Sequence, residues 1–361
     1  MSREQQVHLK GLNGIRAIAA LAVVVSHTLQ FSKHFGLPVN TGIDLAGFGV
    51  TIFFSLSGFL ITYLLLLEKQ KFSTINIKAF YFRRILRIWP LYYFYLLLCV
   101  IVIIVFHLVP LPGPLIYYII LCAYVPFISG TDLPSLGHYW SLGVEEQFYL
   151  FWPWIVKNAN NLIKFLLIFI ACFLLAKVGL RIFHSKTGIL WPYTLIHVCR
   201  FECMAIGALG AVFFFRDNLV FKKIAFNPLA QILAWAMICL MAVNRFHIAS
   251  IIDSDIVAVV TVILIVNVAA NKKSIIKLDF GIFNFLGKIS YGIYVYHPLI
   301  LAFSVEIIGQ FLRNAGSTEK YLLLFLYVFI LTVLVAWLSY NLFEKRFLML
   351  KSKFALIKSS S

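Results

Sequence analysis

Long apolar segments alternate with short polar loops along almost the whole chain. Ten of these segments are about 20 residues long, which is the length that an α-helix needs to cross the hydrocarbon core of a bilayer. The pattern therefore predicts an all-α, polytopic membrane helix bundle with ten transmembrane helices. The predicted spans cover residues 12–32, 45–67, 84–107, 140–156, 162–183, 197–216, 226–245, 251–270, 288–312 and 320–343.

One further apolar stretch, residues 112–130, is short and carries proline at its flanks and within it. Proline interrupts helices because it lacks a backbone N–H and its ring clashes with the preceding turn. We expect this stretch to form a short re-entrant or interfacial segment rather than a span. The loops on either side of it then lie on the same side of the membrane.

Lysine and arginine gather in a subset of the loops. The positive-inside rule places such loops in the cytoplasm, and it puts both termini of the chain there. The predicted organisation is a single transmembrane domain over residues 1–345 and a short basic cytoplasmic tail over residues 346–361. The basic loops that support this topology are residues 68–87, 216–225, 271–287 and the segment after 345.

Composition agrees with a membrane protein. Hydrophobic residues make up 62% of the chain and charged residues only 12%, against about 25% charged in an average soluble domain. The net charge of +17 is divided among short loops, so there is no basic soluble domain to bind nucleic acid. The six cysteines have no metal-binding spacing, and no metal site is predicted.

Ionisable side chains inside a span are costly and are therefore functional candidates. Arg16 and His27 are eleven residues apart in the first span, which puts them on nearly the same helix face about 16 Å apart in depth. Burial favours a neutral imidazole, and a neutral imidazole can take a proton from a hydroxyl. The ordinary alternative is an arginine anchored at the cytoplasmic boundary and a histidine bonded to a neighbouring helix.

The segment FYFRRILRIWPLYY, residues 80–93, presents Arg83, Arg84 and Arg87 at helical spacing. The planar guanidinium fork suits phosphate oxygens, and a helix N-terminus would add its own attraction for anions. We expect these side chains to bind phosphate. A simple topological signal is the alternative, although lysines would serve that purpose equally well.

Two adjacent glutamates, Glu145 and Glu146, begin a predicted span close to His138, Trp140 and Ser141. Glutamates in the first turn satisfy the helix dipole, which explains one carboxylate better than two. A carboxylate near the outer boundary could instead orient an imidazole or a sugar hydroxyl.

In a later segment, ISYGIYVYHPLI, residues Tyr291, Tyr294 and His297 recur every three positions and share a helix face. Packing in an aromatic belt and a functional role are both open for them. Small residues in the second span, Gly49, Ser55, Ser57 and Gly58, allow close approach of helices.

Together these motifs resemble the acyltransferase-3 family of bacterial membrane proteins. They occur in the family's order over nearly the whole chain. Some members carry a soluble esterase-like domain at the C-terminus, and we expect none here. The matching elements are Arg16 and His27 with ten residues between them, the Ser57–Leu60 segment, Arg84 with Arg87, the segment HYWSLGVEEQFYLFWP, and the segment SYGIYVYHP.

The resemblance implies ten transmembrane helices in the bacterial cytoplasmic (inner) membrane. It also implies an acyl-CoA donor, commonly acetyl-CoA, on the cytoplasmic side and an acceptor hydroxyl on a carbohydrate or lipid-linked glycan. The family's essential histidine maps onto His27, and its arginines map onto Arg16, Arg84 and Arg87. No permanently bound cofactor is implied.

These observations give a mechanistic hypothesis. The arginines hold the CoA phosphates, His27 acts as general base, and Glu145 or Glu146 orients His27 or binds the sugar. Transfer through an acyl-histidine is an alternative, and a membrane transporter or flippase is a rival function. The acceptor stays open among O-antigen, capsule, exopolysaccharide, peptidoglycan, a secondary metabolite and a lipid-linked sugar. The residues assigned to the acceptor site are His138, Trp140, Ser141, Tyr291 and His297.

Overall fold

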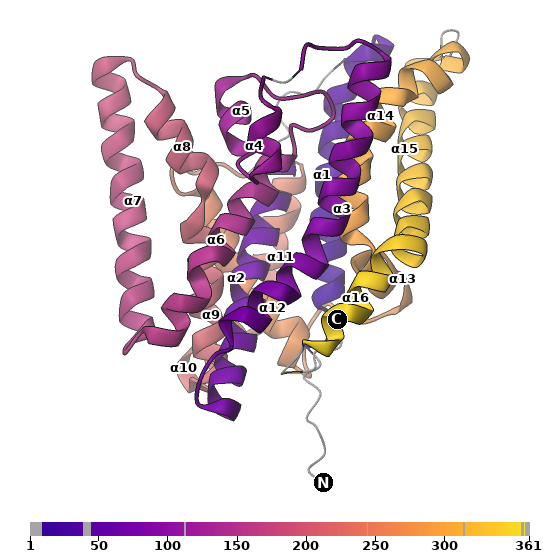
Figure 1. The fold of residues 1–361 in the computed structure, drawn as a ribbon. Coiled ribbons are helices and arrows are strands. Elements are labelled where there is room, and N and C mark those ends of the chain that lie inside the picture. Colours follow the sequence, from indigo (N-terminus) through magenta and orange to yellow (C-terminus); the bar gives the residue numbers. More distant parts are fainter. Residues whose placement is uncertain are drawn as a thin grey trace.

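The computed structural model of the chain is a bundle of helices (Figure 1). It describes residues 9–38, 45–111, 113–243, 245–312, 315–354 and 357. No β-strand occurs among these residues, and the predicted all-α class is confirmed.

The helices follow one another along the chain with short connections. Their bounds are α1 (Leu12–Phe31), η1 (Ser32–Phe35), α2 (Leu45–Phe72), α3 (Ile77–Val105), α4 (Leu115–Ile119), α5 (Tyr124–Ser129), α6 (Tyr139–Asn158), α7 (Leu162–Thr187), α8 (Trp191–Cys199), α9 (Phe201–Phe215), α10 (Leu219–Ala225), α11 (Pro228–Ala242), α12 (Asp253–Ala270), α13 (Gly281–Lys288), α14 (Ser290–Leu312), α15 (Ser317–Ser339), η2 (Tyr340–Glu344) and α16 (Lys345–Lys353).

Eight helices of the described chain are long and apolar enough to cross a membrane, or nine if the bent pair α10 and α11 counts as one span. The predicted number of ten is not confirmed by this measure. Helix α6, which contains the predicted span 140–156, is 20 residues long but is not among the eight. Two glutamates and a glutamine, together with several aromatic residues, lower its mean hydropathy.

Two predicted spans have an irregular backbone within them or at their start. In the span 197–216, Arg200 has a left-handed φ of 43° and separates α8 from α9, although the two helices together form one candidate span, Trp191–Phe215. The span 226–245 contains α11, and the preceding α10 meets it at an angle of 57°. Asn227 caps α11 and Pro228 occupies its first turn, where proline is tolerated.

The stretch 112–130 forms two short helices, α4 with 5 residues and α5 with 6 residues. Neither is long enough to cross a bilayer. Both lie near one end of the bundle, beside the upper half of α3 (Figure 1). This arrangement agrees with the prediction that the stretch does not cross.

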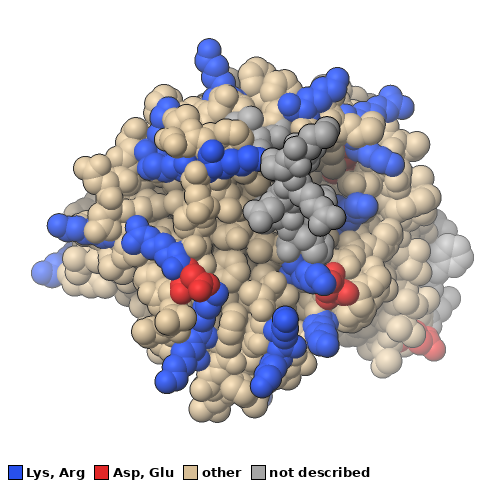
Figure 2. All heavy atoms as spheres, turned by 90° about the horizontal axis from the view of Figure 1, so that it is seen from below, with Lys and Arg blue, Asp and Glu red and all other residues tan. Residues whose placement is uncertain are grey.

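The opposite end of the bundle, called here the basic end, carries the last turns of α2, α6, α10, α13 and α16. Figure 2 views the molecule from this side and shows lysine and arginine side chains spread over the face, with few acidic ones. The residues that define the basic end are Lys69, Lys71, Lys157, Lys222, Lys223, Lys288, Lys351 and Lys353.

The core is built around α2, which packs against α1, α6, α9 and α12. Helices α2 and α9 approach closely at two glycines, as the small residues of the second span predict. A Cβ atom on Gly58 would lie 1.9 Å from the Met204 carbonyl oxygen, and one on Gly207 would lie 2.0 Å from the Ser55 carbonyl oxygen. Any side chain there would force the two helices apart.

The predicted basic tail is not an extended segment in its described part. Residues Lys345–Lys353 form α16, which follows the π-helical turn η2 and packs against α3 at the basic end. The Phe82 and Phe354 rings are stacked with centroids 5.1 Å apart. Apolar contacts therefore fix this segment on the bundle.

Candidate active site

A cavity of about 370 Å³ lies at the basic end and is called here the basic-end cavity. Helices α1, α2, α3, α13, α14 and α16 contribute its walls. Its lining is strongly cationic, with Arg16, Arg83, Arg84, Arg87, Lys288 and Lys351 against Glu68 and Glu344. The four arginines predicted to bind the donor are thus brought together.

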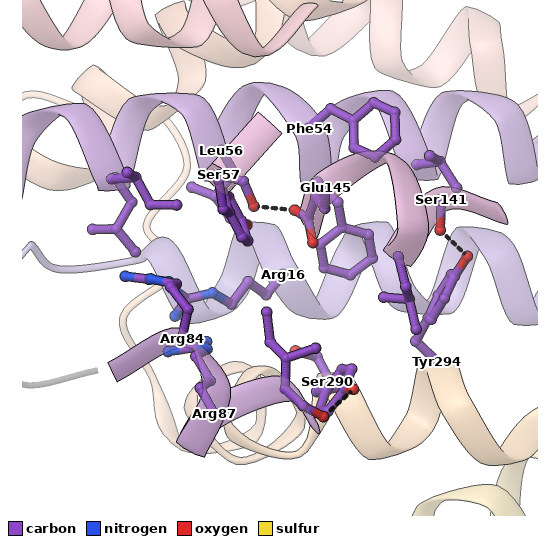
Figure 3. A pocket seen from close by; sticks show the side chains of 18 residues that line it. Arg16, Phe54, Leu56, Ser57, Arg84, Arg87, Ser141, Glu145, Ser290 and Tyr294 are labelled. Carbon is purple, nitrogen blue, oxygen red and sulfur yellow. Dashed lines mark hydrogen bonds between the residues drawn. The ribbon is translucent and has the colours of Figure 1, made fainter. Parts of the chain in front are cut away.

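A smaller cavity of about 100 Å³, the central cavity, lies deeper among α1, α2, α3, α6 and α14 (Figure 3). It shares Arg16, Arg84, Arg87 and Tyr291 with the basic-end cavity. Its other polar lining residues are Ser57, Ser141, Glu145, Tyr149, Ser290 and Tyr294. The arginines therefore stand at the junction of two cavities.

Three of these arginines have no carboxylate within ion-pair distance in the described part of the chain. Arg16, which is buried, donates to the Asn13 side chain at 3.0 Å. The Arg84 guanidinium lies over the Tyr149 ring, and its Nε is buried without a hydrogen-bond partner. Such uncompensated cations lining a cavity are suited to an anionic ligand.

Arg83 differs from the other three. Its Nη2 forms an ion pair with the Glu68 carboxylate at 2.9 Å, and its Nη1 donates to the Phe354 carbonyl oxygen at 3.0 Å. Although Arg83 lines the basic-end cavity, its charge is already balanced.

The expectation that a helix N-terminus assists Arg84 and Arg87 is wrong. Helix α3 begins at Ile77, where the Asn76 side chain accepts a hydrogen bond from the Ala79 N–H. Arg84 and Arg87 lie about two turns or more inside the helix, beyond the reach of its terminal N–H groups. The guanidiniums themselves provide the attraction.

The two glutamates occupy different surroundings. Glu145 lines the central cavity, and its carboxylate accepts a hydrogen bond from the Ser57 hydroxyl. Glu146 accepts a hydrogen bond from the Trp89 indole at 2.8 Å. Because α6 begins at Tyr139, neither glutamate is in its first turn, and helix capping explains neither.

A third cavity, the far-end cavity, has a volume of about 760 Å³ and lies at the end away from the basic end. It is lined by His27, His138, Trp140, Arg200 and Tyr294, among others. It shares Val50 and Tyr294 with the central cavity. The three cavities therefore follow one another through the bundle, with the arginines toward one end and His27 toward the other.

His27 is paired with His297 from α14. The His27 Nδ1 and His297 Nε2 atoms are 2.8 Å apart, and the ring centroids are 5.0 Å apart. His297 Nδ1 is 3.2 Å from the Ile293 carbonyl oxygen. A carbonyl only accepts, so His297 carries its proton on Nδ1 and accepts from His27 Nδ1–H through Nε2. The tautomer inferred for neutral His27 leaves the basic lone pair on Nε2.

The predicted acceptor residues surround this pair at several depths. His138 packs against the His297 ring, with centroids 5.5 Å apart. The Tyr294 hydroxyl donates to the His138 carbonyl oxygen at 2.9 Å and lies 2.6 Å from the Ser141 hydroxyl. Tyr291 donates to the Ile88 carbonyl oxygen near the arginines. Tyr291, Tyr294 and His297 thus line one face of α14, as their spacing predicts.

The predicted proximity of a glutamate to His27 is not found among the described residues, in which the hydrogen-bond partner of His27 is His297. Glu145 lies with the arginines, and Glu146 is held by Trp89. Among the described residues, the group that His27 Nδ1 contacts therefore comes from α14 and not from α6.

Several polar residues of the site are missing from the sequence prediction. Arg200 lines the far-end cavity, where its Nη1 donates to Thr51 Oγ1 at 2.9 Å and its guanidinium faces the Trp140 ring. Tyr149 lines the central cavity beneath Arg84. The rule that ionisable groups within spans are functional candidates would have identified Arg200.

The same rule would have identified a buried cluster outside the three cavities. Lys177 on α7 forms ion pairs with Glu202 on α9 and with Asp255 on α12. Glu202, Cys203 and Asp255 place ligand-capable atoms within 4.8 Å of one another. The Lys177 ammonium supplies a cation at this cluster, which fastens the peripheral helix α7 to the bundle.

Comparison with known proteins agrees with the family resemblance of the sequence motifs. The family model of the acyltransferase domain (acyltransferase-3) matches residues 9–341. The peptidoglycan O-acetyltransferase OatA of Listeria monocytogenes is 36% identical over 183 residues, covering 45% of this chain and 28% of that protein. The O-acetyltransferase OatA of Staphylococcus aureus is 32% identical over 164 residues, covering 41% of this chain and 25% of that protein.

The chain thus spans only about a quarter of the length of these curated relatives. No solved structure matches it.

Proposed function

The chain belongs to the acyltransferase-3 family, and on this premise we propose that it is a membrane O-acetyltransferase. It transfers an acyl group, most commonly acetyl, from acyl-CoA to a hydroxyl of a carbohydrate or lipid-linked glycan. The observation that carries this proposal is the row of three cavities that leads from unpaired arginines to the His27–His297 pair.

The proposed topology follows from charge. The positive-inside rule puts the basic end in the cytoplasm, where acyl-CoA is available, and the far-end cavity on the outer side of the bacterial inner membrane. In this topology the chain has ten spans, with α6 and the bent α10–α11 pair included, and both termini are cytoplasmic. A glycan acceptor would then reach His27 from outside.

The donor is held by its phosphates. Arg16, Arg84 and Arg87 bind phosphate oxygens at the junction of the basic-end and central cavities, because their charges lack carboxylate partners. The pantetheine arm extends through the central cavity toward His27, which lies about 16 Å beyond Arg16 along α1. Tyr294 and Ser141 stand along this route and would move or bind the arm.

The chemical step is general-base catalysis. His27 Nε2 removes the proton from the acceptor hydroxyl as its oxygen attacks the thioester carbonyl carbon. The carbon–sulfur bond breaks, CoA leaves as the thiolate, and the proton on His27 is then available to the sulfur. His297 Nε2 accepts from His27 Nδ1–H throughout, so it holds the ring in the tautomer that the reaction needs.

The identity of the relatives bears on the acceptor. The name of the Listeria relative gives peptidoglycan as its acceptor, which is a carbohydrate polymer outside the membrane. A cell-envelope glycan is therefore the acceptor class that we propose here. Glu145 is reassigned from orienting His27 to lining the central cavity, where it accepts from Ser57 and forms no ion pair with the arginines. His138 and Trp140 are the proposed acceptor contacts.

The test uses the purified full chain in lipid nanodiscs with acetyl-CoA labelled on the acetyl group. Release of CoA thiol that depends on a glycan acceptor, with label transferred to the glycan, is the expected result. A transporter or flippase would bind or move its substrate without releasing thiol. In cells, loss of the chain should lower the mass of a surface glycan by one acyl unit per modified sugar.

A further inference from the structure

Helix α16 forms part of the wall of the basic-end cavity. It crosses the basic end beside α3, with Leu348, Lys351 and Ser352 on the face that lines the cavity. These positions have the spacing i, i+3 and i+4 of a single helix face. Lys345 and Lys353 on the same helix are exposed, whereas Lys351 is half-buried.

Lys351 is surrounded by positive charge. The guanidiniums of Arg16, Arg83, Arg84 and Arg87 line the same cavity as the Lys351 side chain, and their charges repel its ammonium. In the described part of the chain the Lys351 ammonium has neither a hydrogen bond nor an ion pair. Glu68, which is paired with Arg83, and Glu344 are the only carboxylates among the described lining residues. This excess of cations is unfavourable unless an anion occupies the space between them.

Arg83, unlike the other three arginines, is fully engaged by protein groups. Both sides of its guanidinium are engaged, one by the Glu68 carboxylate and one by the Phe354 carbonyl just beyond α16. Glu68 is itself fixed by the Asn76 N–H at 2.7 Å. Arg83 therefore joins α3 to the segment that carries Lys351, and it has little capacity left for a ligand.

The two cavities indicate which cations lie near each part of a bound donor. Arg16, Arg84 and Arg87 line both the basic-end and the central cavity, whereas Lys351 and Lys288 line only the basic-end cavity. A donor whose thioester points toward His27 places the phosphate next to its pantetheine arm at the shared arginines. Its remaining phosphates, at the nucleotide end, then lie toward α16.

From these contacts we infer that Lys351 is a further donor-binding residue that contacts the nucleotide-end phosphates of acyl-CoA, and that Arg83 is a positioning residue that holds α16 in place for it. The inference rests on the proposed function and specifies its donor: a thioester that carries several phosphates, not a phosphopantetheine thioester with one. The compact lysine ammonium suits a phosphate as a point charge.

The experiment measures binding of acetyl-CoA and of acetyl-phosphopantetheine, which has a single phosphate, to the full chain in nanodiscs. Lys351→Ala should raise the Kd for acetyl-CoA about tenfold, the effect of losing one charge-assisted hydrogen bond. The Kd for acetyl-phosphopantetheine should not change. Lys353→Ala is the matched control and should bind both ligands as the unmodified chain does, and Lys351→Arg should restore most of the affinity.

Arg83 is tested through its coupling to Lys351. Arg83→Gln should weaken acetyl-CoA binding to a similar extent, and the double variant should be no weaker than either single one, because both changes remove the same contact. Additive losses would show that Arg83 binds phosphate itself and would refute its positioning role. The melting temperature of each variant checks that the bundle is intact.

Three results would overturn the assignment of Lys351: unchanged acetyl-CoA affinity in Lys351→Ala, an equal loss in Lys353→Ala, or an equal loss for acetyl-phosphopantetheine. Failure of the unmodified chain to bind acetyl-CoA is a different outcome. It would refute the donor of the proposed function and this inference with it.

Discussion

His27 and His297 hydrogen-bond to each other, Nδ1 to Nε2, across 2.8 Å although 270 positions separate them in the chain. The pair joins α1 to α14. His297 is completely buried, and its other ring nitrogen faces the Ile293 carbonyl oxygen. Pro298 follows it and lacks the N–H that would bond the Tyr294 carbonyl, so this carbonyl is also available to the His297 ring. The His297 ring thereby places the proton of a neutral His27 on Nδ1.

His27→Ala should abolish measurable acyl transfer. General-base catalysis contributes about 10²–10⁴ to a rate, so we expect a loss of at least about a hundredfold in kcat. Transfer from acetyl-CoA to glycan in membranes is the measurement. His107→Ala, which changes an exposed histidine, is the control. Near-normal turnover of a folded His27→Ala chain would exclude His27 from the chemistry.

His297 should act on kcat through His27. Replacing it with alanine removes the acceptor for His27 Nδ1–H, and we expect kcat to fall about tenfold to a hundredfold with little change in the KM for acetyl-CoA. His297→Gln can still present an acceptor oxygen and should recover part of the rate. A rise in the KM for the glycan acceptor with unchanged kcat would instead indicate that His297 binds the acceptor, as the sequence analysis predicts.

Arg87→Ala should raise the KM for acetyl-CoA about tenfold or more, because a guanidinium bound to phosphate is lost. Arg87→Lys keeps the charge but not the fork, so we expect an intermediate effect. Arg181→Ala changes an exposed arginine on α7 and should leave the KM unaltered. If the Arg87 variants altered only expression or topology, the phosphate role would be wrong.

Gly58→Ala should destabilise the bundle. Its new Cβ would lie 1.9 Å from the Met204 carbonyl oxygen, so α2 and α9 would have to separate, at a cost of about 1–3 kcal/mol. Gly179→Ala is the matched control, because it also lies inside a helix and nothing is within 4 Å of its added Cβ. Thermal stability in detergent, followed by the monodisperse fraction, should fall for the first variant and not for the second.

The proposed topology predicts opposite sides for two loops. A reporter inserted near residue 135 should be outside the cytoplasm, and one inserted near residue 74 should be inside. Paired reporters that are active in only one compartment make the measurement. A cytoplasmic signal near residue 135 would contradict the parity of spans on which the ten-span topology depends.

The amino-acid sequence was enough to predict the class of fold and the positions of the candidate residues along their helices. Apolar segments of membrane-spanning length must be helical, because a bilayer offers the backbone no hydrogen-bond partners. The helical repeat then puts Arg16 and His27 on one face, and it puts Tyr291, Tyr294 and His297 on another. Those relationships lie within single helices. In the structure Arg16 and Tyr291 line the same two cavities, and His27 and Tyr294 line the far-end cavity.

The packing of the helices in three dimensions sets which helices are neighbours and therefore which groups meet. The sequence suggested a glutamate beside His27, but α14 brings His297 there, and Glu145 lies with the arginines. The sequence analysis grouped Arg83 with Arg84. Adjacent residues of a helix point in directions about 100° apart, and Arg83 forms an ion pair with Glu68 instead. Such contacts between distant segments depend on packing, which no local pattern encodes.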